Sequence, residues 1–405
     1  MRTLLIILDS VGIGAAPDAA DFNDAGAATL QNTSEAVESL ALPVLGRMGL
    51  GNIPALIPGG RPIRGVPPAR APSASFGAMR EVSRGKDTTT GHWEIAGLLI
   101  ERPFHIFPAG PPSFPDELVS EFERRTGRRL IGNKAASGTA IIDELGPEQL
   151  RTGALIAYTS ADSVFQIAAH EEIIPPGELY AACRVARELC VPLRVGRVIA
   201  RPYVGRPGSF QRTENRRDFS FPLPAPTILE HLASAGIPVL AVGKIEDIYD
   251  HRGISKSWHT GNNRDSQARV LELVRQNAGG LVIANFIDFD MLYGHRRDPA
   301  GYARALEETD SFFGALLPLL APGDLLLITA DHGNDPTFRG TDHTREYVPL
   351  LACQPGIAGK SLGVRHGFYD AAQTLARRFA LPPMPHGISA LDFPAPGLNG
   401  ALHFS

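Results

Sequence analysis

Six residues with carboxylate or imidazole side chains form a set in which most members stand where a hydrophobic run stops: Asp9, Asp290, His295, Asp331, His332 and His343. Taken singly, each has an ordinary explanation, because Asp is common in turns and a lone His is usually packed in a core. Taken together, three carboxylates and three imidazoles suit two divalent cations with about three protein ligands each, as in two-metal phosphoryl-transfer sites. The set therefore predicts a metal centre.

The local spacings favour loops over a helix face. Asp290 and His295 are five residues apart, which on an α-helix would point them to different sides, whereas Gly294 permits a turn that brings both inward. Asp331 and His332 are adjacent, so they face one point only from a loop beyond a strand. Two divalent cations against the three carboxylates leave an excess of about one positive charge, so a phosphate is the expected guest.

A threonine run supplies candidate nucleophiles for phosphoryl transfer. Thr88, Thr89 and Thr90 lie between Gly85 and Gly91, beside a lysine and a histidine. A hydroxyl bound to a metal loses its proton more easily and can attack phosphorus in line. Alternatively, the run is only a strand or a helix cap, and the Gly-rich phosphate loop with Lys-Ser/Thr is not matched. The chemistry alone does not choose among the three threonines.

Short, continuous apolar runs carry these ligands and predict strands buried on both faces of a parallel sheet. The runs that we expect to be core strands are 3–8, 239–242, 281–286, 325–329 and 348–352. Helices are expected at 227–235, 302–319 and 371–379. Ligands of parallel sheets collect at the carboxyl ends of the strands, so the ends of three of these strands should meet in one crevice.

The middle of the chain differs in character. Five prolines crowd between residues 103 and 115, a helix is expected from Asp116 to about Gly127, and further strands and helices follow as far as a turn-rich stretch at 207–226. Because Asp9 lies in the first segment and the other ligands lie in the last, one core must be built from both ends around an inserted α/β domain. The expected segments are 1–101 (core), 102–221 (inserted domain) and 222–405 (core).

Composition excludes several functional classes. A chain of 405 residues with 43% hydrophobic and 20% charged residues is typical of a globular protein with two domains. The net charge of −4 gives no electrostatic footprint for nucleic acid, and no apolar run approaches a membrane-spanning length. Three cysteines without Cys-x-x-Cys spacing predict reduced thiols and a cytoplasmic protein. Asp18, Asp21 and Asp24 lack a calcium-loop pattern and are expected on a solvated surface.

Motifs over nearly the whole chain resemble the prokaryotic phosphopentomutase family of the alkaline phosphatase superfamily. The matching stretches are 8–14, 85–88, 90–94, 158–163, 195–202, 288–290, 294–298, 330–336 and 341–347. The Asp-His-Gly motif alone would indicate only the superfamily, whereas the stretches together are specific. Thr89 departs from the family pattern and adds a second hydroxyl beside Thr88.

The resemblance implies an alkaline-phosphatase-like α/β core, with a mostly parallel sheet flanked by helices, and an α/β cap. It also implies an enzyme with two Mn²⁺ ions that interconverts ribose 1-phosphate and ribose 5-phosphate, and the 2-deoxyribose pair, with a sugar bisphosphate as intermediate and activator. One ion would be held by Asp9, Asp331 and His332, and the other by Asp290, His295 and His343. Thr88 would be the phosphorylated nucleophile.

The same resemblance implies contacts to the sugar phosphate. In the cap the matching positions are Ser160, Asp162, Val164, Arg197, Ile199, Arg201 and Arg212, and in the core Lys244. Guanidinium groups grip phosphate oxygens bidentately, and a cap would exclude water that hydrolyses a phosphoenzyme. The residues do not fix the metal, because Zn²⁺ or another divalent ion accepts the same ligands, nor do they fix the oligomeric state.

Two other kinds of protein compete with this interpretation. One is a phosphatase, phosphodiesterase or metal-dependent phosphoglycerate mutase of the same superfamily, of which a hydrolase would release free phosphate. The other is a catalytically silent protein that binds metal or sugar phosphate. The presence of Thr88 beside a full ligand set argues against the silent protein, because binding alone needs no nucleophile.

Overall fold

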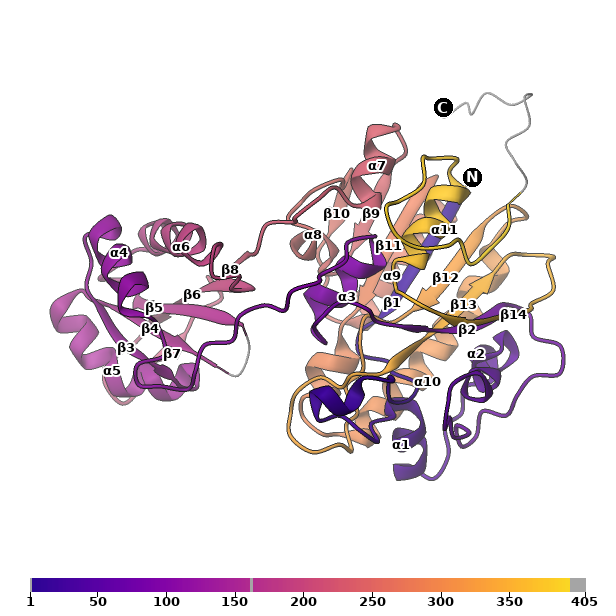
Figure 1. Ribbon diagram of the computed structural model, residues 1–405, viewed down its shortest axis with the longest axis horizontal. Helices are drawn as coiled ribbons and strands as arrows, with labels where there is room; N and C mark the ends of the chain where they lie inside the picture. Colours follow the sequence, from indigo (N-terminus) through magenta and orange to yellow (C-terminus); the bar gives the residue numbers. More distant parts are fainter. Residues whose placement is uncertain (1, 161–162, 394–405) are drawn as a thin grey trace. The chain divides into compact units, whose positions relative to one another are not determined.

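The computed structural model describes residues 2–160 and 163–393 (Figure 1). Two compact units make up the chain: Met1–Glu101 with Pro224–Ser405, and Arg102–Leu223. The first unit therefore contains both ends of the chain, and the second is inserted into it. The second boundary lies two residues after the one expected from the sequence. Asp162 and the tail from Pro394 lie outside the described residues.

The first unit is built on an eight-stranded sheet with the order β10-β9-β11-β1-β12-β13-β2-β14. Its centre consists of β11 (Gly280–Phe286), β1 (Arg2–Leu8) and β12 (Leu325–Thr329), which are adjacent, parallel and buried along their whole length. Next to them, β13 (Tyr347–Cys353) runs antiparallel to both of its neighbours. The predicted mostly parallel sheet is confirmed, and three of its strands end side by side.

The other strands of this sheet are β2 (Ser75–Arg80), β9 (Val239–Val242), β10 (Lys256–Trp258) and β14 (Ser361–Arg365). Helices flank it in two groups (Figure 1). One group consists of α10 (Pro299–Leu316) and the helices that contact it, which are α1 (Thr29–Ala36), α2 (Pro43–Met48) and α9 (Asn263–Arg275). The other comprises α3 (Thr88–Ile95), α7 (Ile228–Ser234), α8 (Ile245–Ile248) and α11 (Asp370–Arg378).

The second unit has a six-stranded sheet with the order β3-β4-β5-β6-β7, in which β8 also pairs with β6. Its strands are β3 (Leu130–Ala135), β4 (Leu155–Thr159), β5 (Val164–His170), β6 (Arg197–Val204), β7 (Gln211–Arg212) and β8 (Arg217–Ser220). One face packs on α4 (Asp116–Thr126) and α6 (Pro176–Cys190), and the other on α5 (Gly138–Thr152). As predicted, Gly127 ends α4, with a φ of 68°.

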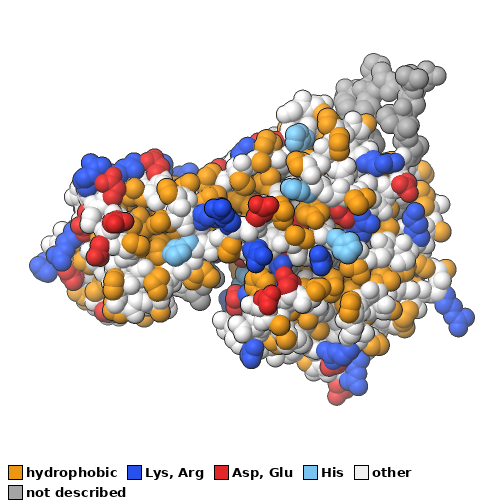
Figure 2. Space-filling model, in the orientation of Figure 1, with side chains coloured by type: hydrophobic (Ala, Val, Ile, Leu, Met, Phe, Trp, Pro, Cys, Tyr) orange, Lys and Arg blue, Asp and Glu red, His pale blue; other side chains and the backbone are white. Residues whose placement is uncertain are grey.

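The distribution of surface charge and the state of the cysteines agree with what the composition predicted. Acidic and basic side chains are interspersed on the face shown in Figure 2. All three cysteines are buried and unpaired, as predicted. In the ranges that the structure describes, none of the helices has both the length and the apolar character needed to cross a bilayer.

The expectation that the three N-terminal aspartates form a solvated surface is wrong for Asp24. This residue is buried, its carboxylate lies 3.0 Å from Lys86 Nζ, and it accepts a hydrogen bond from the backbone N–H of Arg345 at 2.9 Å. Asp18 lies 2.9 Å from the Arg345 guanidinium. The partners are distant in the chain, so the local pattern of acids did not reveal them.

Candidate active site

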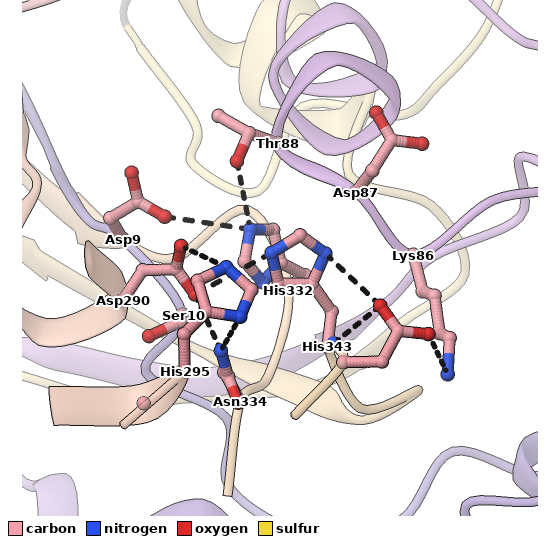
Figure 3. Close-up of polar contacts among 12 residues, drawn as sticks. Asp9, Ser10, Lys86, Asp87, Thr88, Asp290, His295, His332, Asn334 and His343 are labelled. Carbon is pink, nitrogen blue, oxygen red and sulfur yellow. Dashed lines mark hydrogen bonds and ion pairs between the residues drawn. The ribbon is translucent and has the colours of Figure 1, made fainter. Parts of the chain in front are cut away.

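The adjacent strand ends bring three aspartates together. Asp9 directly follows β1 and Asp290 lies beyond β11 (Figure 3). Asp331 lies just beyond β12. The backbone N–H of Ser10 donates to Asp331 Oδ1 at 3.1 Å, which ties the ends of β1 and β12 to each other. All three carboxylates are buried or nearly so, with 4%, 0% and 8% of Asp9, Asp331 and Asp290 exposed. The three aspartates therefore lie together at the carboxyl ends of adjacent strands, as expected from the sequence.

A π-helix brings Asp290 and His295 together. Residues Phe289–Gly294 are π-helical, and the N–H of His295 donates to the carbonyl of Asp290 at 3.1 Å. Residues five apart are hydrogen-bonded neighbours in this geometry, and His295 Nε2 lies 3.0 Å from Asp290 Oδ2. Gly294 lets the Asn334 side chain lie close to the backbone, because a Cβ at position 294 would lie 2.8 Å from the side-chain amide of Asn334.

The ligand atoms cluster in two overlapping groups, Asp290-His295-His343 and Asp9-Asp290-His332, each with its atoms within 4.8 Å of one another. The first group equals one of the two sets implied by the resemblance. In the other implied set, His332 Nε2 lies 3.4 Å from Asp9 Oδ1 and 3.3 Å from Asp331 Oδ2. Asp290 belongs to both groups of ligand atoms.

Buried atoms that make no hydrogen bond indicate that these residues suit metal ions. Asp9 Oδ1, Asp331 Oδ2 and His343 Nε2 are buried and make no hydrogen bond in the described part of the chain; Asp331 Oδ2 has ion-pair contacts with His92 Nδ1 at 3.0 Å and His332 Nε2 at 3.3 Å. Burial and the carboxylates of Asp331 and Asp290 raise the pKa of Asp9 well above its usual value. Burial favours a raised pKa for Asp290 too, but His343 and His295 outweigh it and lower that pKa. Divalent cations would satisfy such lone pairs and neutralise the charge.

Among the three threonines, Thr88 is the one whose hydroxyl reaches the ligand set. Thr88 is the first residue of α3, and its Oγ1 lies 3.2 Å from His332 Nε2 (Figure 3). Asp87 caps the helix by accepting from the N–H groups of Thr89 and Thr90, and the Thr90 hydroxyl donates to Asp87 Oδ2 at 2.6 Å. The segment is thus a helix cap, as one interpretation held, and it also presents a hydroxyl to the ligands, as the other requires.

Sequence reasoning missed the residues that support the ligands. Buried His92 has its Nδ1 3.0 Å from Asp331 Oδ2 and 2.9 Å from the Thr88 carbonyl. The Asn285 amide donates to Asp9 Oδ2 at 3.2 Å and lies 3.1 Å from His92 Nε2. Asn285 interrupts an apolar strand run, and that interruption was the available signal.

A second amide supports the other group of ligands. Asn334 Nδ2 donates to Asp290 Oδ1 at 2.7 Å and lies 3.4 Å from His295 Nδ1 (Figure 3). Its Oδ1 accepts from the Arg297 guanidinium at 2.6 Å. Outer partners of this kind orient metal ligands and tune their affinity. Each group of candidate ligands therefore has its own asparagine.

The candidate sugar-phosphate residues of the second unit gather around one sheet. Val164 and Arg197 begin β5 and β6 and are paired in register. Arg197, Ile199 and Arg201 alternate along β6, so their side chains share one face. Arg212 lies in β7 opposite Tyr203, and Ser160 follows β4. In the first unit, Lys244 precedes α8, and its charge acts to lower the pKa of Asp9.

The chain is similar to known proteins over most of its length. A Metalloenzyme superfamily model matches residues 1–383. Over 381 residues the chain is 55% identical to a phosphopentomutase of Anaeromyxobacter sp. (strain K), covering 94% of this chain and 96% of the relative. It is 53% identical to the phosphopentomutase of Anaeromyxobacter sp. (strain Fw109-5), with 94% and 95% covered. A solved Leishmania mexicana phosphoglycerate mutase is 12% identical, with a TM-score of 0.48 and 96% and 97% covered.

The matches to phosphopentomutases span nearly the whole chain and exceed half identity. The superfamily match also includes every candidate metal ligand, from Asp9 to His343. The chain therefore belongs to the phosphopentomutase family, whose members are metal-binding isomerases of the alkaline phosphatase superfamily.

Proposed function

We propose that the protein interconverts ribose 1-phosphate and ribose 5-phosphate, and the 2-deoxyribose pair, through a phosphorylated Thr88 and a sugar bisphosphate. The relatives that are named phosphopentomutase support the overall reaction. One observation carries the choice of nucleophile: Thr88 Oγ1 lies 3.2 Å from His332 Nε2, within the candidate metal ligands.

We assign one metal ion to Asp9, Asp331 and His332, and the other to Asp290, His295 and His343. The buried atoms of Asp9, Asp331 and His343 that make no hydrogen bond support this assignment. Divalent ions bound there would neutralise the carboxylates, polarise phosphate oxygens and lower the pKa of a coordinated hydroxyl. Mn²⁺ is the proposed metal, and Zn²⁺ is the main alternative for this ligand chemistry.

We assign the following roles to residues of the chain. Thr88 carries the phosphate, and Asp87 holds the start of α3 so that the threonine faces the ligands. A free hydroxyl of the sugar phosphate attacks the phosphorus of phosphothreonine, the bond to Thr88 Oγ1 breaks, and the hydroxyl proton passes to that oxygen. The resulting bisphosphate returns its other phosphate to Thr88 by the reverse step, which leaves the isomerised sugar phosphate. A sugar bisphosphate also primes the unphosphorylated enzyme.

We further assign sugar-phosphate contacts to the residues that the family resemblance indicates. Those of the second unit are Ser160, Asp162, Val164, Arg197, Ile199, Arg201 and Arg212. The resemblance also indicates Lys244 of the first unit. The common face of Arg197, Ile199 and Arg201 supports this assignment, since guanidinium groups on one side of a sheet suit an anionic ligand there.

The nucleophile is tested with single alanine variants of the threonine run. Thr88→Ala should abolish conversion of ribose 1-phosphate to ribose 5-phosphate, whereas Thr89→Ala, the matched control, should retain most of it. Mass spectrometry of the wild type after exposure to a sugar bisphosphate should locate a phosphate on Thr88. Undiminished turnover by Thr88→Ala would remove Thr88 from the mechanism.

The same assay separates a mutase from a hydrolase. Free inorganic phosphate is measured against the amount of isomerised sugar phosphate. A mutase returns the phosphate to Thr88, so little free phosphate should accumulate. Phosphate release that exceeds isomerisation would identify a phosphatase or phosphodiesterase instead.

A further inference from the structure

The Arg297 guanidinium connects segments that carry one group of candidate metal ligands. Its Nη1 donates to the Gly294 carbonyl at 2.9 Å, at the end of the π-helix. The same nitrogen donates to Asn334 Oδ1 at 2.6 Å and to the Asp335 carbonyl at 2.9 Å, in the loop after β12. These contacts fasten the end of the π-helix to that loop.

The same side chain binds the exposed part of the loop between β12 and β13. Arg297 Nε donates to the Gly340 carbonyl, and its Nη2 donates to the Asp342 carbonyl at 3.0 Å. The carbonyl between these two, that of Thr341, lies 2.7 Å from His295 Nδ1. A carbonyl oxygen only accepts, so Nδ1 carries the proton of the neutral ring and Nε2 is free to bind a metal ion. Three successive carbonyls of the loop are therefore bound from the side of the π-helix.

The guanidinium also fixes the orientation of the Asn334 amide. A guanidinium group has donors and no acceptor, so the atom of Asn334 that faces it must be the amide oxygen. The amide nitrogen is then turned toward Asp290 Oδ1, 2.7 Å away, and toward His295 (Figure 3). Without Arg297 the amide would be free to rotate and to present its oxygen to the Asp290 carboxylate, which is a repulsive contact.

The backbone of Arg297 is unusual for a residue with a long side chain. Its φ of 54° lies in the left-handed region, which favours glycine. Such residues persist where the surrounding structure imposes the conformation, and they cluster at functional sites. The contacts of the Arg297 side chain with two loop segments supply that compensation.

We propose that Arg297 is a positioning residue for the metal ion that we assign to Asp290, His295 and His343. It does not bind the ion. It holds His295, the Asn334 amide and the loop that ends at His343 in the arrangement that the ion requires. The role rests on the proposed function only through that metal assignment.

The charge of Arg297 and its hydrogen bonds would affect metal binding in opposite directions. Burial lowers the pKa of Arg297, and three carboxylates act against burial, among them that of the candidate ligand Asp290. A positive charge repels a divalent cation, so if the charge alone mattered, its removal would strengthen Mn²⁺ binding. A positioning role predicts weaker binding instead. The sign of the change therefore distinguishes the two.

Arg297→Met keeps the apolar stem of the side chain and removes every donor. Calorimetric titration of the metal-free full chain with Mn²⁺ should show about 10- to 100-fold weaker binding at one of the two sites and a smaller change at the other. His295→Ala identifies which of the two affinities belongs to the affected site. Arg297→Lys keeps the charge but has one nitrogen in place of the planar fork, so binding should stay about 10-fold or more below that of the wild type.

Arg296→Met is the matched control for these variants. Arg296 is the adjacent arginine and is exposed, so its removal takes away the same charge without the contacts of Arg297. Both Mn²⁺ affinities should stay within roughly 2-fold of the wild type, because exposed charges are screened by solvent and salt. Circular dichroism checks that each variant is folded.

A second measurement follows the loop without metal. Trypsin cleaves after arginine, and Arg339 is exposed in the same loop. In metal-free Arg297→Met, cleavage at Arg339 should be about 10-fold faster than in the wild type, because the hydrogen bonds to the Gly340 and Asp342 carbonyls are lost and the loop opens more often. Arg296→Met should be cleaved there at the rate of the wild type.

The outcomes separate this role from the proposed function. Unchanged or tighter Mn²⁺ binding by Arg297→Met, or an equal loss at both sites, would overturn the role even if the enzyme isomerises pentose phosphates. Weaker binding at one site, together with a wild type that does not isomerise, would support the role and reject the proposed reaction. A wild type that binds no Mn²⁺ would reject the metal assignment and the role with it.

Discussion

Replacing Asn334 with alanine is expected to weaken one of the two candidate metal sites more than the other. Asn334 Nδ2 donates to Asp290 Oδ1 at 2.7 Å and lies 3.4 Å from His295 Nδ1. A hydrogen bond to a charged group contributes about 1.5–3 kcal/mol, and loss of such an outer partner lowers metal affinity about 10- to 100-fold. We expect a loss of this size at the site that contains Asp290, His295 and His343.

The other site depends on a different amide. Asn285 Nδ2 donates to Asp9 Oδ2 at 3.2 Å, and the amide also lies 3.1 Å from His92 Nε2. Asn285→Ala should therefore show the opposite selectivity and weaken the site that contains Asp9 and Asp331. The longer hydrogen bond places the expected loss nearer the lower end of the range, at about 10-fold.

Calorimetric titration of the metal-free full chain with Mn²⁺ resolves the two affinities. Asn52→Ala is the matched control: Asn52 donates to the Ala69 carbonyl at 3.0 Å and accepts from the Ala69 N–H at 2.8 Å. That variant also loses two hydrogen bonds but should bind both ions as the wild type does. An equal loss at both sites in Asn334→Ala, or no loss at either, would refute the assignment of one amide to each site.

Three further predictions concern stability and the thiols. Arg345→Met leaves the buried Glu81 carboxylate without the guanidinium that lies 2.6 Å from it. The free energy of unfolding, measured in urea, should fall by about 3–5 kcal/mol. A change below ~1 kcal/mol would contradict a stabilising role for this ion pair. Burial raises the pKa of the Cys190 thiol to about 12, so a thiol reagent at pH 8 should label it only after unfolding, and rapid labelling of the native chain would contradict its burial. Chelation of bound metal should lower the melting temperature and added Mn²⁺ should restore it, since a ligand that binds only the folded state stabilises it; an unchanged melting temperature would argue against metal binding.

The strands of the core were predictable because their sequences are continuous apolar runs. The predicted strands 239–242 and 325–329 coincide with β9 and β12. The opening strand starts one residue earlier than predicted, at Arg2. The side chain of Arg2 is only 4% exposed because it forms a buried ion pair with Asp324. A pairing across 322 residues leaves no local trace in the pattern.

The helix predicted at 302–319 shows the usual uncertainty at helix ends. In the structure, α10 starts earlier, at Pro299, because Asp298 caps it by accepting from the N–H of Gly301 at 2.8 Å. The helix ends at Leu316, and a 3-10 turn covers Leu317–Leu319. Proline is well tolerated at the first position of a helix, and this signal at Pro299 was available in the sequence.

For the site, the sequence identified residue types but not their geometry. The apolar runs that stop at aspartates predicted a crevice with oxygen and nitrogen ligands, and the parallel neighbours β11, β1 and β12 bring these candidate ligands together. The five-residue interval between Asp290 and His295 was explained by an open turn, whereas the structure shows a π-helix there. Helices of this kind are rare, so the spacing alone did not indicate one.

The sequence by itself predicted which residues are candidate metal ligands, which segments form strands, and that both ends of the chain share one core. The family resemblance indicated Thr88, but only the tertiary structure shows that its hydroxyl reaches the candidate ligands, because Thr88 and His332 are 244 residues apart. The tertiary structure also decided which amides support Asp9 and Asp290, since Asn285 and Asn334 lie 276 and 44 residues from them. Distances of a few ångströms between such residues depend on the order of the strands in the sheet, and no local sequence pattern encodes that order.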